Sequence, residues 1–132
     1  MNKLIGVSIV AALSLLSFGA YAGNSNIQKC SESTLRGTYV FNSHGKTNGN
    51  DYADVGHEYF DGRGHVIGES LDNSGNKAEL IGTYDIHHDC TGTIDYSSTG
   101  AHEKIYLSSK GDTFVYIESS ENSYVSGVET RQ

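Results

Sequence analysis

Beyond residue 30 the chain carries short runs of alternating apolar and polar residues, and no segment keeps a helical period. Around residues 36–42, for example, Leu35, Gly37, Tyr39 and Phe41 share one face of an extended chain. The runs end in clusters of Ser, Asn, Asp and Gly, which are typical of tight turns. The pattern therefore predicts an all-β chain.

Eight strands are expected, and their successive hairpin connections favour antiparallel pairing of neighbours in sequence. The clearest hairpin turn is Asp61-Gly62-Arg63-Gly64. Eight such strands can close into a small up-and-down barrel, which leaves no exposed sheet edge. The alternative arrangement of the same strands is a β-sandwich. The expected strands are residues 36–42, 55–60, 65–71, 78–86, 91–97, 103–108, 113–118 and 124–129.

Composition agrees with this picture and adds a targeting segment. The whole chain has 16 glycines, 9 tyrosines and no proline. Residues 1–22 resemble a secretory signal peptide, with Lys3 before an apolar stretch and Ala20-Tyr21-Ala22 at the cleavage site. We expect residues 23–132 to form a single β-barrel domain, secreted or periplasmic and of bacterial origin. No later segment is apolar enough to predict a membrane span.

Export to an oxidising compartment would allow the two cysteines to form a disulfide. Cys30 and Cys90 would meet an oxidising compartment, and each is the other's only possible partner within the chain. We expect a Cys30–Cys90 disulfide. In an up-and-down barrel both cysteines lie at the same end, where residues 30–34 would act as a plug.

Charge narrows the range of partners. The chain has 9 basic and 16 acidic residues, and removal of Lys3 with the signal segment leaves 8 against 16, a formal charge of −8. Such a chain repels phosphate backbones, so nucleic acid is not an expected partner. The oligomeric state is not predicted.

Several segments together resemble a widespread group of small secreted bacterial proteins to which no activity is assigned. The resemblance implies an exported β-domain with this disulfide. The segments are Cys30, Leu35-x-Gly37-Thr38-Tyr39, Tyr59-Phe60-Asp61-Gly62-x-Gly64-His65-Val66-x-Gly68, Gly82-Thr83-Tyr84, Asp89-Cys90-Thr91-Gly92-Thr93, Gly127 and Arg131-Gln132.

A more distant resemblance concerns Gly37-x-Tyr39 and Arg131, which are similar to the lipocalin pattern of a first-strand Gly-x-Trp packed against a late basic residue. Tyr replaces Trp here. The strand count is also similar to that of avidin and of the allene oxide cyclase and dirigent barrels. The absence of Trp argues against biotin binding of the avidin kind.

Candidate ligand-binding residues lie at the barrel mouth opposite the disulfide and inside the strands. The mouth loops contain His44, Tyr52 and His102. Tyrosine suits a pocket for a partly polar ligand because it joins an apolar ring to a hydroxyl. The alternative is that the strand tyrosines face outward or fill the barrel. The strand tyrosines are Tyr39, Tyr59, Tyr84, Tyr106 and Tyr116.

Other chemistry is not expected. The adjacent His87 and His88 point to opposite faces if extended, so they cannot both reach one metal ion. The chain has no G-x-S-x-G motif, and both cysteines are used in the expected disulfide. We predict neither a catalytic residue, nor a metal ligand, nor a cofactor.

The leading hypothesis is therefore an exported β-barrel that binds a small apolar or aromatic ligand. Two alternatives remain. One is an isomerase or cyclase resembling allene oxide cyclase, which a buried Glu or His beside the cavity would favour. The other is a secreted structural protein, or one that interacts with a host or with the envelope, that binds no small ligand.

Overall fold

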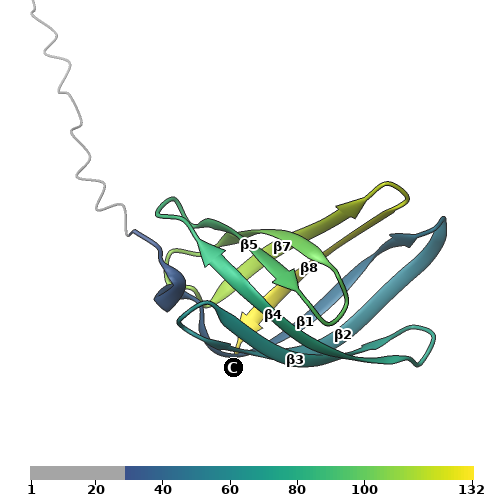
Figure 1. Ribbon diagram of the computed structural model, residues 1–132, viewed down its shortest axis with the longest axis horizontal. Coiled ribbons are helices and arrows are strands. Elements are labelled where there is room, and N and C mark those ends of the chain that lie inside the picture. Colours follow the sequence, from purple (N-terminus) through teal and green to yellow (C-terminus); the bar gives the residue numbers. More distant parts are fainter. Residues whose placement is uncertain (1–28) are drawn as a thin grey trace, which may run out of the picture.

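The computed structural model describes residues 29–132, which form one short 3-10 helix and eight β-strands (Figure 1). The predicted signal peptide of residues 1–22 lies outside the described residues. No helix among the described residues has the length and apolarity to span a membrane. The elements are η1 (Glu32–Thr34), β1 (Arg36–Thr47), β2 (Asn50–Asp61), β3 (His65–Asp72), β4 (Lys77–Ile86), β5 (Thr91–Tyr96), β6 (His102–Leu107), β7 (Thr113–Ser120) and β8 (Ser123–Arg131).

The eight strands form a closed antiparallel up-and-down barrel, as the sequence predicts. Each strand pairs with its neighbour in sequence, and β1 closes the sheet by pairing with β8. In the closing register Tyr39 lies opposite Arg131 and Thr47 lies opposite Ser123. The β-sandwich alternative is excluded, because a sandwich would divide these strands between two sheets.

The first hairpin is longer than the sequence analysis expects. The sequence pattern ends the first strand at residue 42 and begins the second at residue 55, yet β1 and β2 run on to a turn at Asn48 and Gly49. Both residues have positive φ, 49° and 79°, as a two-residue type I′ hairpin turn requires. Asn-Gly is the strongest short hairpin signal in a sequence, so the longer strands follow from local turn chemistry.

Inward-facing side chains divide the barrel interior into two halves. At the end that contains η1, aromatic rings pack edge to face around Phe60, with centroids 5.2 Å from Tyr39, 5.3 Å from Tyr84 and 5.8 Å from Phe114. These rings and their apolar neighbours form the core of the protein, which we call the packed end. Its other buried members include Leu35, Val66, Ile86, Ile94, Ile105 and Leu107.

The disulfide closes the packed end. Cys30 and Cys90 are bonded, with their Cα atoms 5.0 Å apart, which confirms the predicted pairing. Helix η1 lies beside β4, and the Tyr84 hydroxyl donates to the carbonyl of Leu35 at 2.8 Å. Figure 1 shows η1 at the same end of the barrel as the C-terminus. Residues 30–34 therefore lie over this end, as expected.

Arg131 joins the last strand to the first at the packed end. Its guanidinium donates to the Tyr39 hydroxyl at 2.9 Å and to the carbonyls of Thr34 and Gly111, each at 2.9 Å. It also lies 5.4 Å from the centroid of the Tyr39 ring. The contact between a late basic residue and the first-strand aromatic ring, which the resemblance to lipocalins implied, is present.

Replacing Arg131 is expected to destabilise the barrel. Arg131→Ala removes charge-assisted hydrogen bonds to two backbone carbonyls, at a cost of about 2 kcal/mol in the free energy of unfolding. Arg131→Lys keeps the charge, but an ammonium group lacks the planar guanidinium geometry that reaches the Tyr39 hydroxyl and both carbonyls. It should therefore recover less than half of the lost stability. Urea denaturation at neutral pH measures both. An Arg131→Ala protein as stable as the wild type would contradict this role.

Candidate functional site

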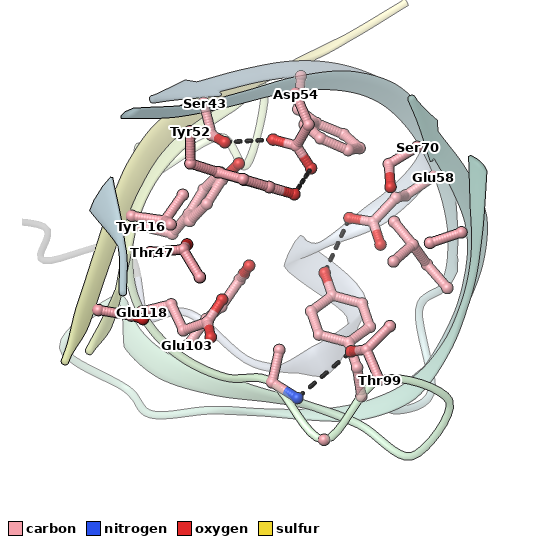
Figure 2. Close-up of a pocket in the computed structure, with 18 of the residues that line it drawn as sticks. Ser43, Thr47, Tyr52, Asp54, Glu58, Ser70, Thr99, Glu103, Tyr116 and Glu118 are labelled. Atoms are coloured by element: carbon pink, nitrogen blue, oxygen red, sulfur yellow. Dashed lines mark hydrogen bonds between the residues drawn. The ribbon is translucent and has the colours of Figure 1, made fainter. Parts of the chain in front are cut away.

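Beyond the packed end, the other half of the barrel encloses an open cavity of about 460 Å³. That volume is enough for a small organic molecule. Figure 2 shows its side chains pointing inward from the ring of strands. The lining residues are Phe41, Ser43, Thr47, Tyr52, Asp54, Glu58, Ser70, Ala78, Leu80, Tyr96, Thr99, Gly100, Ala101, Glu103, Tyr116, Glu118, Ser120, Ser123, Val125 and Glu129.

Acidic side chains dominate the polar part of this lining. Asp54 and Glu58 come from β2, and Glu103, Glu118 and Glu129 come from β6, β7 and β8. No lysine, arginine or histidine is among the described residues that line the cavity. The cavity thus concentrates five carboxyl groups without a basic partner.

Three of these carboxyl groups are deeply buried. Glu58, Glu103 and Glu129 are 0%, 8% and 1% exposed. The Tyr96 hydroxyl donates to Glu58 Oε2 at 3.0 Å, and the Glu58 and Glu129 side chains are hydrogen-bonded to each other. Glu58 Oε1, Glu103 Oε2 and Glu129 Oε2 nevertheless have no hydrogen-bond partner. Buried polar atoms are normally paired, so these three oxygens are available to a bound molecule.

Burial changes the ionisation of the deep carboxyl groups. It raises the pKa of Glu103 to about 9, and the charges of Glu58, Glu118 and Asp54 act in the same direction. Burial and the adjacent Glu58 raise the pKa of Glu129 well above its ordinary value. Burial also raises the pKa of Glu58, although hydrogen bonds from Glu129 and Tyr96 oppose the effect. At neutral pH Glu103 is therefore protonated, and the same effects disfavour ionisation of Glu58 and Glu129.

The wall nearer the mouth has a different hydrogen-bond arrangement. Asp54 accepts a hydrogen bond from Tyr52 at 3.1 Å and another from the Ser43 hydroxyl, and Figure 2 shows the three side chains together. Desolvation and the adjacent Asp54 raise the pKa of the Tyr52 hydroxyl above its ordinary value. Tyr52 thus remains a hydrogen-bond donor at any physiological pH.

A glycine makes room for one aromatic ring of the cavity. A Cβ atom at Gly127 in β8 would lie 2.6 Å from the ring carbon Cζ of Tyr116 and 2.5 Å from a backbone oxygen of Asn42. Real Cβ atoms do not approach other atoms so closely, so only glycine lets the Tyr116 ring lie flat against β8. The Tyr116 hydroxyl is thereby directed into the cavity wall.

The predicted site residues are divided among three places. Tyr52 and Tyr116 line the cavity. Tyr39 and Tyr84 are buried in the packed end and do not line it. The remaining four lie on the outer wall, because their strand positions alternate with inward-facing neighbours. They are His44, Tyr59, His102 and Tyr106.

Three histidines, His65, His87 and His102, pair with acids on the outer surface. His102 Nδ1 lies 2.5 Å from Asp95 Oδ1, and His87 Nε2 lies 3.2 Å from Asp85 Oδ2. All four side chains are more than half exposed. Within residues 29–132, no three His, Cys, Asp or Glu side chains are arranged to hold a metal ion.

Sequence reasoning missed the deep carboxyl groups, although the strand pattern contained a signal. Glu103 alternates with Ile105 and Leu107, both buried, and Glu58 alternates with the buried Phe60. An acid in phase with core residues of a strand points into the barrel. Once the inward face of each strand is known, its alternation therefore shows which acidic residues point into the barrel.

Comparison with known proteins identifies the architecture. No family model matches the chain, and no curated protein matches it. Several solved structures have a similar fold. One is described as EF1p2_mFAP2b bound to DFHBI; its TM-score is 0.60 at 16% sequence identity, and the match covers 75% of this chain and 94% of that chain. Another is a de novo designed fluorescence-activating β-barrel, with a TM-score of 0.58, 16% identity, and coverage of 76% of this chain and 96% of that chain. A third is the redesigned β-barrel mFAP1 bound to DFHBI, with a TM-score of 0.60, 18% identity, and coverage of 76% of this chain and 97% of that chain. At these identities the likeness concerns the barrel fold.

Proposed function

We propose that this chain is an exported protein that binds a small ligand inside its barrel. The observation that carries the proposal is the cavity of about 460 Å³, open at the loop end and closed at the other by the packed end. Cavities of this size at barrel mouths are common ligand sites. The Cys30–Cys90 disulfide supports a secreted or periplasmic location, since disulfides persist in oxidising compartments.

The ligand has an apolar or aromatic body. Phe41, Leu80 and Val125 give the cavity an apolar wall, and the rings of Tyr96 and Tyr116 offer faces for stacking. Two of the similar structures, the mFAP2b and mFAP1 barrels, are described as bound to DFHBI. An eight-stranded barrel of this kind is therefore large enough to hold a small molecule.

Filling the cavity with a larger side chain tests whether the ligand binds inside the barrel. Small aromatic compounds are expected to perturb the backbone amide NMR signals of cavity residues such as Leu80 and Val125. Ala78→Phe, which places a ring in the cavity wall of β4, should weaken that binding at least tenfold. Thr83→Phe adds the same ring to the outer face of β4 and should leave binding unchanged. Equal binding by both variants would place the ligand elsewhere.

A second candidate function is acid catalysis on the bound molecule, as in an isomerase or cyclase. The protonated Glu103 favours it, because a carboxylic acid with a pKa of about 9 is a proton donor at neutral pH. Under this alternative a bound compound is converted during incubation, and Glu103→Gln stops the conversion without abolishing binding. Recovery of every bound compound unchanged supports binding alone.

A further inference from the structure

The buried acids of the cavity are only partly hydrogen-bonded within the protein. Glu58, Glu103 and Glu129 enter the interior from three separate strands, β2, β6 and β8. Each retains one oxygen without a hydrogen-bond partner, and no basic side chain of the described lining compensates them. A carboxyl group placed in a protein interior without a partner destabilises the fold, so a bound molecule is the natural source of its partner.

We propose that the ligand is a small organic amine whose ammonium group binds among Glu58, Glu103 and Glu129. The inference rests on the ligand-binding function proposed above and specifies the chemical class of the ligand. An ammonium group has three N–H donors and no acceptor, so it can pair with buried carboxyl oxygens that lack donors. The apolar or aromatic body then lies along Leu80, Val125 and the tyrosine rings.

A metal ion does not fit the same arrangement. No three acidic, histidine or cysteine side chains among the described residues are close enough together to ligate one ion. An organic ammonium group needs fewer carboxyl contacts than a metal ion, because the molecule also gains contacts with the apolar wall and a cation–π contribution from the faces of Tyr96 and Tyr116. The arrangement therefore favours an organic cation over a metal ion.

A neutral alcohol fits less well, because it brings no positive charge that would stabilise a carboxylate in this acidic lining. The titratable groups that face Glu103 are Asp54 and Glu58 from β2, Tyr96 from β5, Tyr116 and Glu118 from β7, and Glu129 from β8. All of them are acids, and their charges disfavour ionisation of one another. A bound cation opposes this effect, because it favours the ionised carboxylate.

Binding should consequently release a proton. Glu103 alone holds its proton at neutral pH, and an ammonium group alongside favours the carboxylate, so the proton leaves for solvent as the ion pair forms. If one proton is released, affinity rises by up to about tenfold for each pH unit between about pH 5 and about pH 8. Binding of a neutral molecule has no such dependence.

Isothermal titration calorimetry with phenethylamine and phenethyl alcohol tests the proposal, because the probes differ in charge and share the aromatic body. The amine is expected to bind at least tenfold more tightly at neutral pH, with proton release detected from buffers of different ionisation enthalpy. Glu103→Gln should weaken amine binding at least tenfold and leave alcohol binding unchanged. Glu69→Gln removes the same charge from the outer face of β3 and should change neither.

The outcomes separate this inference from the function on which it rests. Equal affinity for the two probes, or equal weakening of both by Glu103→Gln, overturns the amine assignment and leaves a small-ligand barrel in place. Absence of binding by both probes contradicts the proposed function itself. Glu129→Gln is an independent second variant in case Glu103→Gln fails to fold, and it carries the same expectation.

Discussion

Reduction of the Cys30–Cys90 disulfide is expected to lower the melting temperature by about 15 °C or more. The bond joins residues 60 positions apart and closes the packed end, where Cys30 is 1% exposed. In the chain-entropy model a loop of this length restricts the unfolded chain by about 4 kcal/mol. Thermal unfolding followed by circular dichroism, with and without reductant, measures the effect.

The matched control separates the covalent bond from other effects of the reductant. A Cys30→Ser/Cys90→Ser protein should melt near the reduced wild type, and reductant should not change its melting temperature further. A wild-type melting curve that is unchanged on complete reduction would contradict the stabilising role of the disulfide.

Glu103→Gln is expected to stabilise the protein at neutral pH, by up to roughly 3 kcal/mol. The folded-state pKa of Glu103, about 9, lies above the ordinary value of 4.5, which the unfolded chain keeps. Between these two values the folded state binds more protons than the unfolded state, so wild-type stability falls as the pH rises. The substitution removes the group that has to ionise on unfolding, and its effect should vanish near pH 4.

Other acids act in a separate pH range. Backbone hydrogen bonding to His65 lowers the pKa of Asp61, and the Asn76 side chain lowers that of Asp72, so their contribution is present above about pH 4 and lost below it. Wild-type stability should therefore be greatest near about pH 5. Urea unfolding across this range, with Glu69→Gln as the surface control, measures both effects. Equal stability of wild type and Glu103→Gln at every pH would show that Glu103 ionises freely.

Most of the fold could be predicted because hairpins are encoded locally. Turn residues such as Asp61-Gly62-Arg63-Gly64 determine where each strand ends, and eight hairpin-linked strands have few ways to avoid exposed edges. The disulfide followed from there being only two cysteines. The extension of β1 and β2 was missed because the polar stretch around Asn48-Gly49 resembles a loop, although those two residues specify a tight hairpin turn.

The candidate site was less predictable because it depends on which face of each strand is inward. Tyrosine suits either face of a small barrel, so Tyr59 and Tyr106 on the outside resemble Tyr116 on the inside when only the sequence is considered. Acids are assigned to the surface by default, and no local pattern shows that Glu58 of β2 and Glu129 of β8 meet inside the barrel, on either side of β1. The cavity arises from barrel closure, which brings distant strands together.

The central claim is that the barrel interior, beyond the packed end, holds a small molecule. Intermolecular nuclear Overhauser effects between bound phenethylamine and methyl-labelled protein test it most directly. The account predicts contacts from the ring protons to the methyl groups of Leu80 and Val125, which line the cavity. Contacts confined to outward-facing methyl groups such as those of Ile67, Ile81 and Val115, or no contacts at all, would contradict it.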